Sequence, residues 1–147
     1  MADTPLLPPG IHDVDPSDLD NHFLSSFGAS RTRRTLIDGF QRYIEALKKY
    51  AVRFEIWLDG SFVTSKEDPN DIDLVVFAPA SELNALPLAD QNSLRGLFDR
   101  PSCKSVFGCD VLFAVAEDEN TRSYWRGWYG YDREEQPKGI ARVTLEP

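Results

Sequence analysis

The residues that build disulfide scaffolds and zinc sites are scarce in this chain. Its 147 residues include only two cysteines, Cys103 and Cys109, and two histidines, His12 and His22. A zinc site needs about four Cys or His ligands brought together, and the histidines lie far from the cysteines in the sequence. We therefore expect no zinc, and two reduced cysteines with a structural role near the start of a strand.

Long apolar runs are absent as well. No apolar stretch approaches the roughly 20 residues that a helix needs to cross a bilayer. Residues 1–5 also lack the basic and apolar regions of a signal peptide. These absences predict a cytoplasmic protein that does not insert into a membrane.

Positive charge is the third shortage. The chain carries 24 acidic and 16 basic residues, which gives a formal net charge of −8. Affinity for a nucleic-acid backbone depends on Lys and Arg side chains that displace counterions, so a long DNA or RNA partner is disfavoured. A basic cluster, Arg31, Arg33 and Arg34, stands at an expected helix start, where exposure to solvent explains it more simply than a function does.

The chain contains enough apolar residues for one core. With 147 residues and 41% hydrophobic content, it suits a single domain, for which about 100–150 residues is usual. We predict one domain over residues 1–147, with an N-terminal extension and short helix at 1–29 and a core at 30–147.

Apolar periodicity and turn residues predict the order of the elements. The expected helices run from Asp15 to Gly28, from Ser30 through Leu47, over 88–98 and over 119–129. The expected strands run from about Val52 to Leu58, up to Phe77, over 109–115 and over 139–145. Strands that alternate with helices predict an α/β (α+β) fold, in which a mixed sheet is covered by helices mainly on one face.

The most informative stretch joins a glycine turn to two aspartates. Gly60 and Ser61 follow an apolar strand and let the backbone turn into a short helix with free N–H groups, a geometry that can bind phosphate. Asp71 and Asp73 stand at the start of the next strand, where alternation puts both carboxylates on one face. Paired carboxylates at such a place can bridge divalent cations.

A third aspartate lies in a separate apolar run. Asp110 stands within residues 109–115, and a carboxylate buried in such a strand needs a partner. If this strand lies beside the one that carries Asp71 and Asp73, the three carboxylates meet and repel unless one is protonated or metal ions neutralise them. Metal is the simpler interpretation. A turn at residues 69–71 would explain Asp71 alone, but not Asp73 or Asp110.

These residues resemble the signature of a known group, the DNA polymerase beta-like nucleotidyltransferase superfamily. Its pattern is Gly-Ser, then Asp-x-Asp, then a separate strand with a single Asp, and the matching residues are Gly60, Ser61, Asp71, Asp73 and Asp110. The chain also resembles a small family of minimal, nucleotidyltransferase-like bacterial proteins in residues 7–12, 57–64 and 137–140. The resemblance implies a nucleotidyltransferase-type sheet.

The resemblance also implies an activity, the transfer of a nucleoside monophosphate from a nucleoside triphosphate to a hydroxyl. In the superfamily the three aspartates, here Asp71, Asp73 and Asp110, hold two Mg²⁺ ions, for which Mn²⁺ can substitute. The phosphates of the nucleotide would be held by Gly60 and Ser61. Lys66 either adds a charge contact to them or is a solvated lysine.

The acceptor and the partners are wider expectations. The acceptor hydroxyl would belong to a protein, a small molecule or an RNA end. Small members of the superfamily occur in toxin–antitoxin and phage-defence systems, so a protein partner is also expected. The alternatives are a non-catalytic module that binds another protein, such as an antitoxin or partner subunit, and a nucleotide sensor without turnover.

Two further groups of residues have competing interpretations. Trp125, Trp128, Tyr129 and Tyr131 form an aromatic cluster that could stack a base, although such a cluster more often belongs to a core or an interface. Lys138 and Arg142 could contact phosphate or be ordinary surface residues.

Overall fold

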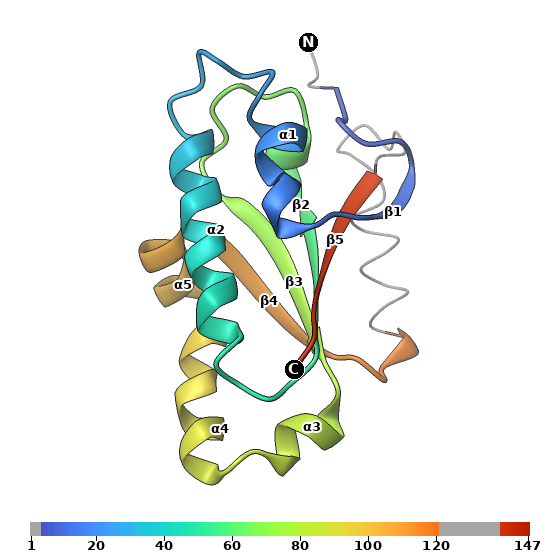
Figure 1. Ribbon diagram of the computed structural model, residues 1–147, viewed down its shortest axis with the longest axis vertical. Helices are drawn as coiled ribbons and strands as arrows, with labels where there is room; N and C mark the ends of the chain where they lie inside the picture. The colour runs from blue at the N-terminus through green and yellow to red at the C-terminus, as the bar shows by residue number, and fades with distance from the viewer. Residues whose placement is uncertain (1–3, 121–138) are drawn as a thin grey trace.

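A five-stranded mixed sheet forms the centre of the computed structural model, which describes residues 4–120 and 139–147. The strands lie in the order β1-β5-β2-β3-β4 (Figure 1). They are β1 (Gly10–Asp13), β2 (Phe54–Asp59), β3 (Ile72–Ala78), β4 (Cys109–Val115) and β5 (Gly139–Leu145). β2 is antiparallel to its neighbours β3 and β5, whereas β1 pairs parallel with β5 and β4 pairs parallel with β3. The α/β (α+β) class with a mixed sheet is therefore confirmed.

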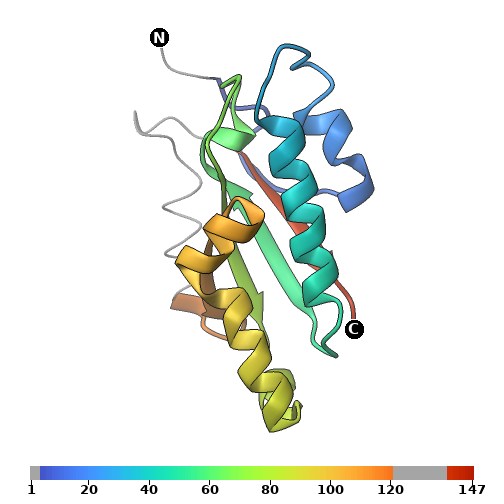
Figure 2. The same ribbon diagram turned by 90° about the vertical axis from the view of Figure 1, so that its left-hand side faces the viewer.

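The described helices connect these strands. They are α1 (Leu19–Phe23), α2 (Arg33–Leu47), α3 (Ala80–Ala85), α4 (Leu88–Arg95) and α5 (Arg100–Phe107), with 3₁₀ turns at Pro16–Asp18, Gly60–Val63 and Gly96–Phe98. Figures 1 and 2 show α2 and α5 on the same face of the sheet. Within the described ranges, no helix combines the length and the apolar character needed to span a bilayer.

Alternation along the strands divides the buried side chains into two layers. Phe54, Ile56 and Leu58 of β2 belong to the main core, which α2 also lines, whereas Trp57 joins Val75 of β3 in a second cluster. Burial on both faces explains why the apolar runs of these strands are nearly continuous. A slip of one residue would exchange the two layers, so this pattern specifies the strand register.

The helix α5 approaches α2 closely at Gly39. A Cβ atom added at Gly39 would lie 2.0 Å from the carbonyl oxygen of Phe107, the last residue of α5. Only glycine leaves room for this approach. Since β4 follows α5 after a single residue, Gly108, the contact also positions the start of β4, where Asp110 lies.

The N-terminal part of the chain differs from the predicted elements. The first strand is β1, so the expectation that strands begin near Val52 is wrong. The segment Gly10–Asp13 is recognised as a strand only through its partner β5, which lies at the other end of the chain. The helix predicted from Asp15 ends at Phe23, before Gly28.

The segment before Asp110 holds a second difference. The sequence pattern predicts one helix that stops before Pro101, yet α5 begins at Arg100 with Pro101 in its first turn. Proline is compatible with this position because the first N–H groups of a helix have no partner within it. Asp99 caps α5 by accepting a hydrogen bond from the Ser102 backbone N–H at 3.1 Å. Most of the helix predicted at 119–129 lies outside the described residues.

Candidate functional site

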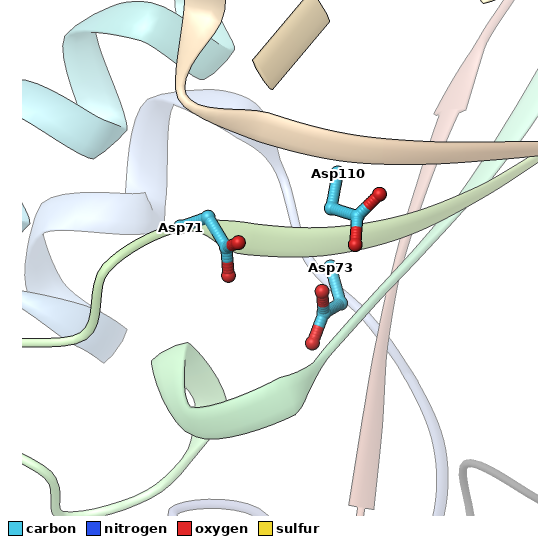
Figure 3. Close-up of side chains that lie close together, drawn as sticks. All are labelled: Asp71, Asp73 and Asp110. Atoms are coloured by element: carbon cyan, nitrogen blue, oxygen red, sulfur yellow. The ribbon is translucent and has the colours of Figure 1, made fainter. Parts of the chain in front are cut away.

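The predicted carboxylates meet at one end of two parallel strands. In the pairing of β3 with β4, Asp73 is opposite Asp110, and Asp71 directly precedes β3. Figure 3 shows the three side chains on the same side of these strands. One carboxylate oxygen from each of Asp71, Asp73 and Asp110 lies within 4.8 Å of the other two. The expectation that the Asp110 strand lies beside the Asp71–Asp73 strand is thus confirmed.

The glycine turn lies directly against this cluster. β2 pairs with β3 so that Asp59 is opposite Asp73, which brings the turn Gly60–Val63 next to the carboxylates (Figure 3). Gly60 has a φ of 77°, and a Cβ atom there would lie 2.1 Å from the Oδ2 atom of Asp73. Glycine is therefore required both for the backbone conformation and for the space that Asp73 occupies.

The other two residues predicted to bind phosphate are placed differently. Ser61 is half-buried inside the turn, and its carbonyl oxygen accepts a hydrogen bond from the Thr64 hydroxyl at 2.7 Å. The side chain of Lys66 is exposed, while its carbonyl oxygen accepts a hydrogen bond from Arg33. The structure brings Gly60 and Ser61 to the carboxylates, and presents Lys66 at the surface of the same loop.

Asp59 is an acidic residue that the sequence analysis does not single out. It ends β2, is buried, and faces Asp73 across the antiparallel pair. Its signal in the sequence is a charged residue between the apolar strand and Gly60. The register thus places a fourth acidic residue beside the cluster.

Arg33 corrects the prediction for the basic cluster. Solvent exposure explains Arg31 and Arg34, but Arg33 is 0% exposed. Its guanidinium donates four hydrogen bonds to backbone carbonyl oxygens: Phe23 at 3.0 Å, Phe62 at 2.8 Å, and Thr64 and Lys66 at 2.7 Å each. Three of these acceptors belong to the turn after Gly60 or the loop that follows it. Arg33 therefore holds the loop that carries Ser61 in place.

Burial affects the charge of Arg33 without removing it. Desolvation lowers the pKa of Arg33 to about 10, and the nearby charge of Asp68 opposes this change. A guanidinium with that pKa is protonated at neutral pH. The positive charge strengthens the hydrogen bonds to the carbonyl oxygens, because charge-assisted bonds are stronger than neutral ones. The ring of Phe27, whose centroid is 3.7 Å from the guanidinium carbon, covers the group.

Two cations from α5 contact the cluster. Arg100 donates two hydrogen bonds to Asp110, from Nε to Oδ1 at 2.5 Å and from Nη2 to Oδ2 at 3.0 Å. Lys104, one turn later, places Nζ 3.3 Å from Oδ2 of Asp71. The hydrogen bonds from Arg100 lower the pKa of Asp110, although partial burial opposes this shift. The sequence pattern does not identify either cation, because it does not predict α5.

The remaining predicted residues lie away from the carboxylates or outside the described ranges. Arg142 forms a two-point ion pair with Asp13 between β5 and β1, at 2.6 and 3.0 Å. The aromatic cluster Trp125, Trp128, Tyr129 and Tyr131, and also Lys138, lie outside the described residues.

Both cysteines lie in the core. Cys103 and Cys109 are buried and free of a disulfide. Burial raises the pKa of the Cys103 thiol to about 11 and that of the Cys109 thiol to about 12. Both thiols are therefore protonated at neutral pH, as expected for cysteines with a structural role.

The donor set fits a hard divalent cation. Carboxylate oxygens are the ligands that Mg²⁺ and Mn²⁺ prefer, and Asp71, Asp73 and Asp110 supply three of them from a small space. Because a side chain at position 60 would displace Asp73, the glycine turn is shaped around the carboxylate that a cation would contact. The described residues thus include an acidic triad that could hold a metal ion.

Comparisons with known proteins identify a family for this chain, but they do not identify an activity. Searches of the curated proteins and of the solved structures found no match. A family profile matches residues 1–144, nearly the whole chain, and its description is a family of unknown function, DUF6932. The chain belongs to the DUF6932 family.

Proposed function

We propose that the protein is a metal-dependent nucleotidyltransferase, which moves a nucleoside monophosphate from a nucleoside triphosphate to a hydroxyl group. The observation that carries this proposal is the convergence of Asp71, Asp73 and Asp110 within 4.8 Å. Gly60, which lies against Asp73, belongs to the Gly-Ser part of the superfamily signature and also supports the proposal. The resemblance of these residues to the DNA polymerase beta-like superfamily supports the same activity.

Asp71, Asp73 and Asp110 are the residues that would hold two Mg²⁺ ions. Bound ions of this kind neutralise the charge of a triphosphate and lower the pKa of an acceptor hydroxyl. The carboxylates converge from two paired strands, so their positions are held by the sheet before substrate arrives. Such preorganisation removes the cost of assembling the site during the reaction.

The loop after β2 would position the phosphates. Gly60 allows its backbone to approach the carboxylates, and Arg33 holds the segment from Phe62 to Lys66. In the reaction, the acceptor oxygen forms a bond to the α-phosphorus and the bond to the bridging oxygen breaks. The electron pair leaves with pyrophosphate, and the hydroxyl proton passes to water. The backbone of Gly60 and Ser61 would orient the triphosphate for this in-line displacement.

The acceptor is a hydroxyl of a protein, a small molecule or an RNA end. The net charge of −8 disfavours a long nucleic acid, so a protein or a small acceptor suits the surface better. A protein partner encoded in a toxin–antitoxin or phage-defence system belongs to the same proposal, since such a partner would supply the acceptor surface.

Transfer of label from α-labelled nucleoside triphosphates into a host extract tests the activity. The wild type should label an acceptor in the presence of Mg²⁺ or Mn²⁺, and the Asp71→Ala, Asp73→Ala double variant should not. A matched control is Asp38→Ala, Glu45→Ala, which removes the same charge from the exposed face of α2. Sensitivity of the product to nuclease or protease identifies the acceptor class. Equal labelling by the wild type and the aspartate variant would contradict the proposal.

A second candidate is a non-catalytic binding module or nucleotide sensor. Arg100 and Lys104 already neutralise two of the carboxylates, so the fold does not require metal to balance the cluster. Release of pyrophosphate separates the candidates. A sensor or a binding module would bind a triphosphate or a protein partner without releasing pyrophosphate.

A further inference from the structure

The cations of α5 occupy the carboxylates that the proposed function assigns to metal. Arg100 contacts both oxygens of Asp110, and Lys104 contacts one oxygen of Asp71. A divalent ion bound between the aspartates would have to share these oxygens with the two cations or displace them. Arg100 and Lys104 are therefore part of the energetics of metal binding.

The exposure of the two cations favours displacement. The side chains of Arg100 and Lys104 are each 59% exposed, whereas those of Asp110 and Asp71 are only 17% and 19% exposed. The carboxylates are thus held by the sheet and its edge, while the cations reach them from solvent on long, flexible side chains. Ion pairs with an exposed partner shift an equilibrium only a few-fold, so a divalent ion can replace them.

The charge balance of the cluster indicates what Arg100 and Lys104 would contact after they are displaced. Three carboxylates with Arg100 and Lys104 carry a net charge of −1, from −3 and +2. Two divalent ions would make the same group strongly positive, and the displaced cations would then repel the ions. A polyphosphate chain relieves this repulsion because it brings negative charge to the same place.

The geometry of α5 fits a polyphosphate. Arg100 and Lys104 are four residues apart, so they lie on the same side of the helix, next to the carboxylate cluster. Arginine binds phosphate oxygens through its planar fork, and lysine binds them as a point charge. Both side chains can therefore contact neighbouring phosphate groups of one substrate.

We propose that Arg100 and Lys104 are displaceable counter-charges, which hold Asp110 and Asp71 until metal binds and then bind the phosphates of the substrate triphosphate. This inference rests on the proposed function and deepens it, since it assigns two residues to nucleotide binding. The two side chains compete with metal in the absence of nucleotide, and favour the metal–nucleotide complex in its presence.

Binding measurements with Arg100→Gln, Lys104→Gln and the double variant test the inference. The first probe is Mn²⁺ alone, followed by electron paramagnetic resonance of the free ion. The double variant should bind Mn²⁺ about tenfold more tightly than the wild type, because two competing cations are gone. The second probe is a non-hydrolysable triphosphate analogue with Mg²⁺, followed by calorimetry. The double variant should bind this analogue at least about tenfold more weakly.

Two kinds of control accompany these variants. Arg34→Gln and Lys48→Gln remove the same charges from exposed ion pairs elsewhere on the surface, with Asp20 and Glu45, and should leave both affinities unchanged. Arg100→Lys keeps the charge but loses the planar fork, so its affinity for the analogue should lie between those of Arg100→Gln and the wild type. Melting temperatures confirm that every variant is folded.

The possible outcomes separate this inference from the proposed function. The alternative is that the two cations only hold the carboxylates in position. Removing them would then weaken Mn²⁺ binding, and this result would overturn the inference. An unchanged affinity for Mn²⁺ or for the analogue would also overturn it. If Mn²⁺ binding depends on Asp71 and Asp73 but not on the cations, only the inference fails. If the wild type binds no Mn²⁺, the inference and the proposed function fail together.

Discussion

Two arginines on neighbouring helices serve the candidate site in opposite ways. Arg33 of α2 is fully buried and donates four hydrogen bonds to backbone carbonyl oxygens. Arg100 of α5 is 59% exposed and donates two hydrogen bonds to one carboxylate. The first donates to backbone carbonyl oxygens and fixes the position of a loop. The second has an ionised side chain as its partner, and fixes the charge of the site.

The two arginines differ in what happens to their hydrogen-bond acceptors when the arginine is removed. Without Arg33, buried carbonyl oxygens lose their donors, and each unsatisfied oxygen lowers the free energy of unfolding. Without Arg100, Asp110 can take a metal ion or solvent instead, because the pair lies at the edge of the sheet. A buried cation with several acceptors is therefore a structural element, whereas an exposed cation on a carboxylate is exchangeable.

The largest effect is expected from the carboxylates themselves. Asp73→Asn removes one of the charges that we propose to bind metal, and keeps the shape of the side chain. Stabilisation of charge by metal is worth several kcal/mol, so turnover in the labelling assay should fall on the order of a thousandfold. Addition of Mn²⁺ should raise the melting temperature of the wild type and not that of the variant. Asp38→Asn, on the exposed face of α2, is the control, and a tenfold loss or less in Asp73→Asn would contradict the metal assignment.

Next in size is the effect of Arg33→Lys. Lysine keeps the charge but cannot reach four carbonyl oxygens with one ammonium group, so some buried acceptors lose their donors. The free energy of unfolding should fall by about 2–4 kcal/mol, as measured by urea denaturation. Arg34→Lys, one residue further along the same helix and exposed, should change it by less than about 0.5 kcal/mol. Equal effects of the two substitutions would remove the contrast between buried and exposed cations.

The three aspartates, unlike Arg33 and α5, are placed correctly by sequence patterns. The positions of Asp71, Asp73 and Asp110 follow from local rules, since alternation and apolar runs identify their strands. The pairing of those strands is the one long-range assumption, and the register of Asp73 with Asp110 confirms it. The described part of the fold accordingly agrees with the predicted class and with the strands β2 to β5.

The features that the sequence does not reveal depend on tertiary contacts. The burial of Arg33 depends on carbonyl oxygens at positions 62 to 66, about thirty residues away, which no local pattern links to it. The strand β1 exists because β5 pairs with it. The helix α5 is hidden by Pro101, which is read locally as a stop, although its position in the first turn makes it compatible with a helix start.

A smaller effect is expected from Gly60→Ala, which tests how closely the loop held by Arg33 fits the carboxylates. Its matched control is Gly108→Ala, since the two glycines have nearly the same φ, 77° and 71°. Both substitutions should lower the stability by about 1–2 kcal/mol through backbone strain. Only the Gly60 variant brings its Cβ against Asp73, whereas the Cβ at Gly108 meets the end of the Leu36 side chain at 2.9 Å.

The comparison between these glycines isolates the contact with the carboxylate. Gly60→Ala should therefore weaken Mn²⁺ binding about tenfold, which is about 1.4 kcal/mol, and Gly108→Ala, whose Cβ meets no carboxylate, should weaken it much less. Calorimetric titration of both variants provides the measurement. If the two variants bind Mn²⁺ equally well, the turn is not fitted to Asp73 in the way that we describe.

The smallest effect concerns the pH dependence of the exchangeable pair. The hydrogen bonds from Arg100 lower the pKa of Asp110 in the folded state below its ordinary value. The stabilisation is then fully present above the ordinary pKa, about 4, and is lost as the pH falls through the lower folded value. Because Arg100 is more than half exposed, the pair contributes at most about 1 kcal/mol.

Removing Arg100 should weaken the loss of stability in acid at this site. In Arg100→Gln, Asp110 loses the hydrogen bonds that lower its pKa in the folded state, so the variant should lose less stability than the wild type on acidification. The stability gap between the two proteins, measured by urea denaturation, should be widest at pH 7 and close towards pH 3. Arg34→Gln, which removes exposed surface pairs with Asp20 and Asp38, should open a gap of less than about 0.5 kcal/mol at every pH. A gap for Arg100→Gln that does not narrow in acid would mean that the ion pair with Asp110 contributes nothing to folding, and that Arg100 is held there by other contacts.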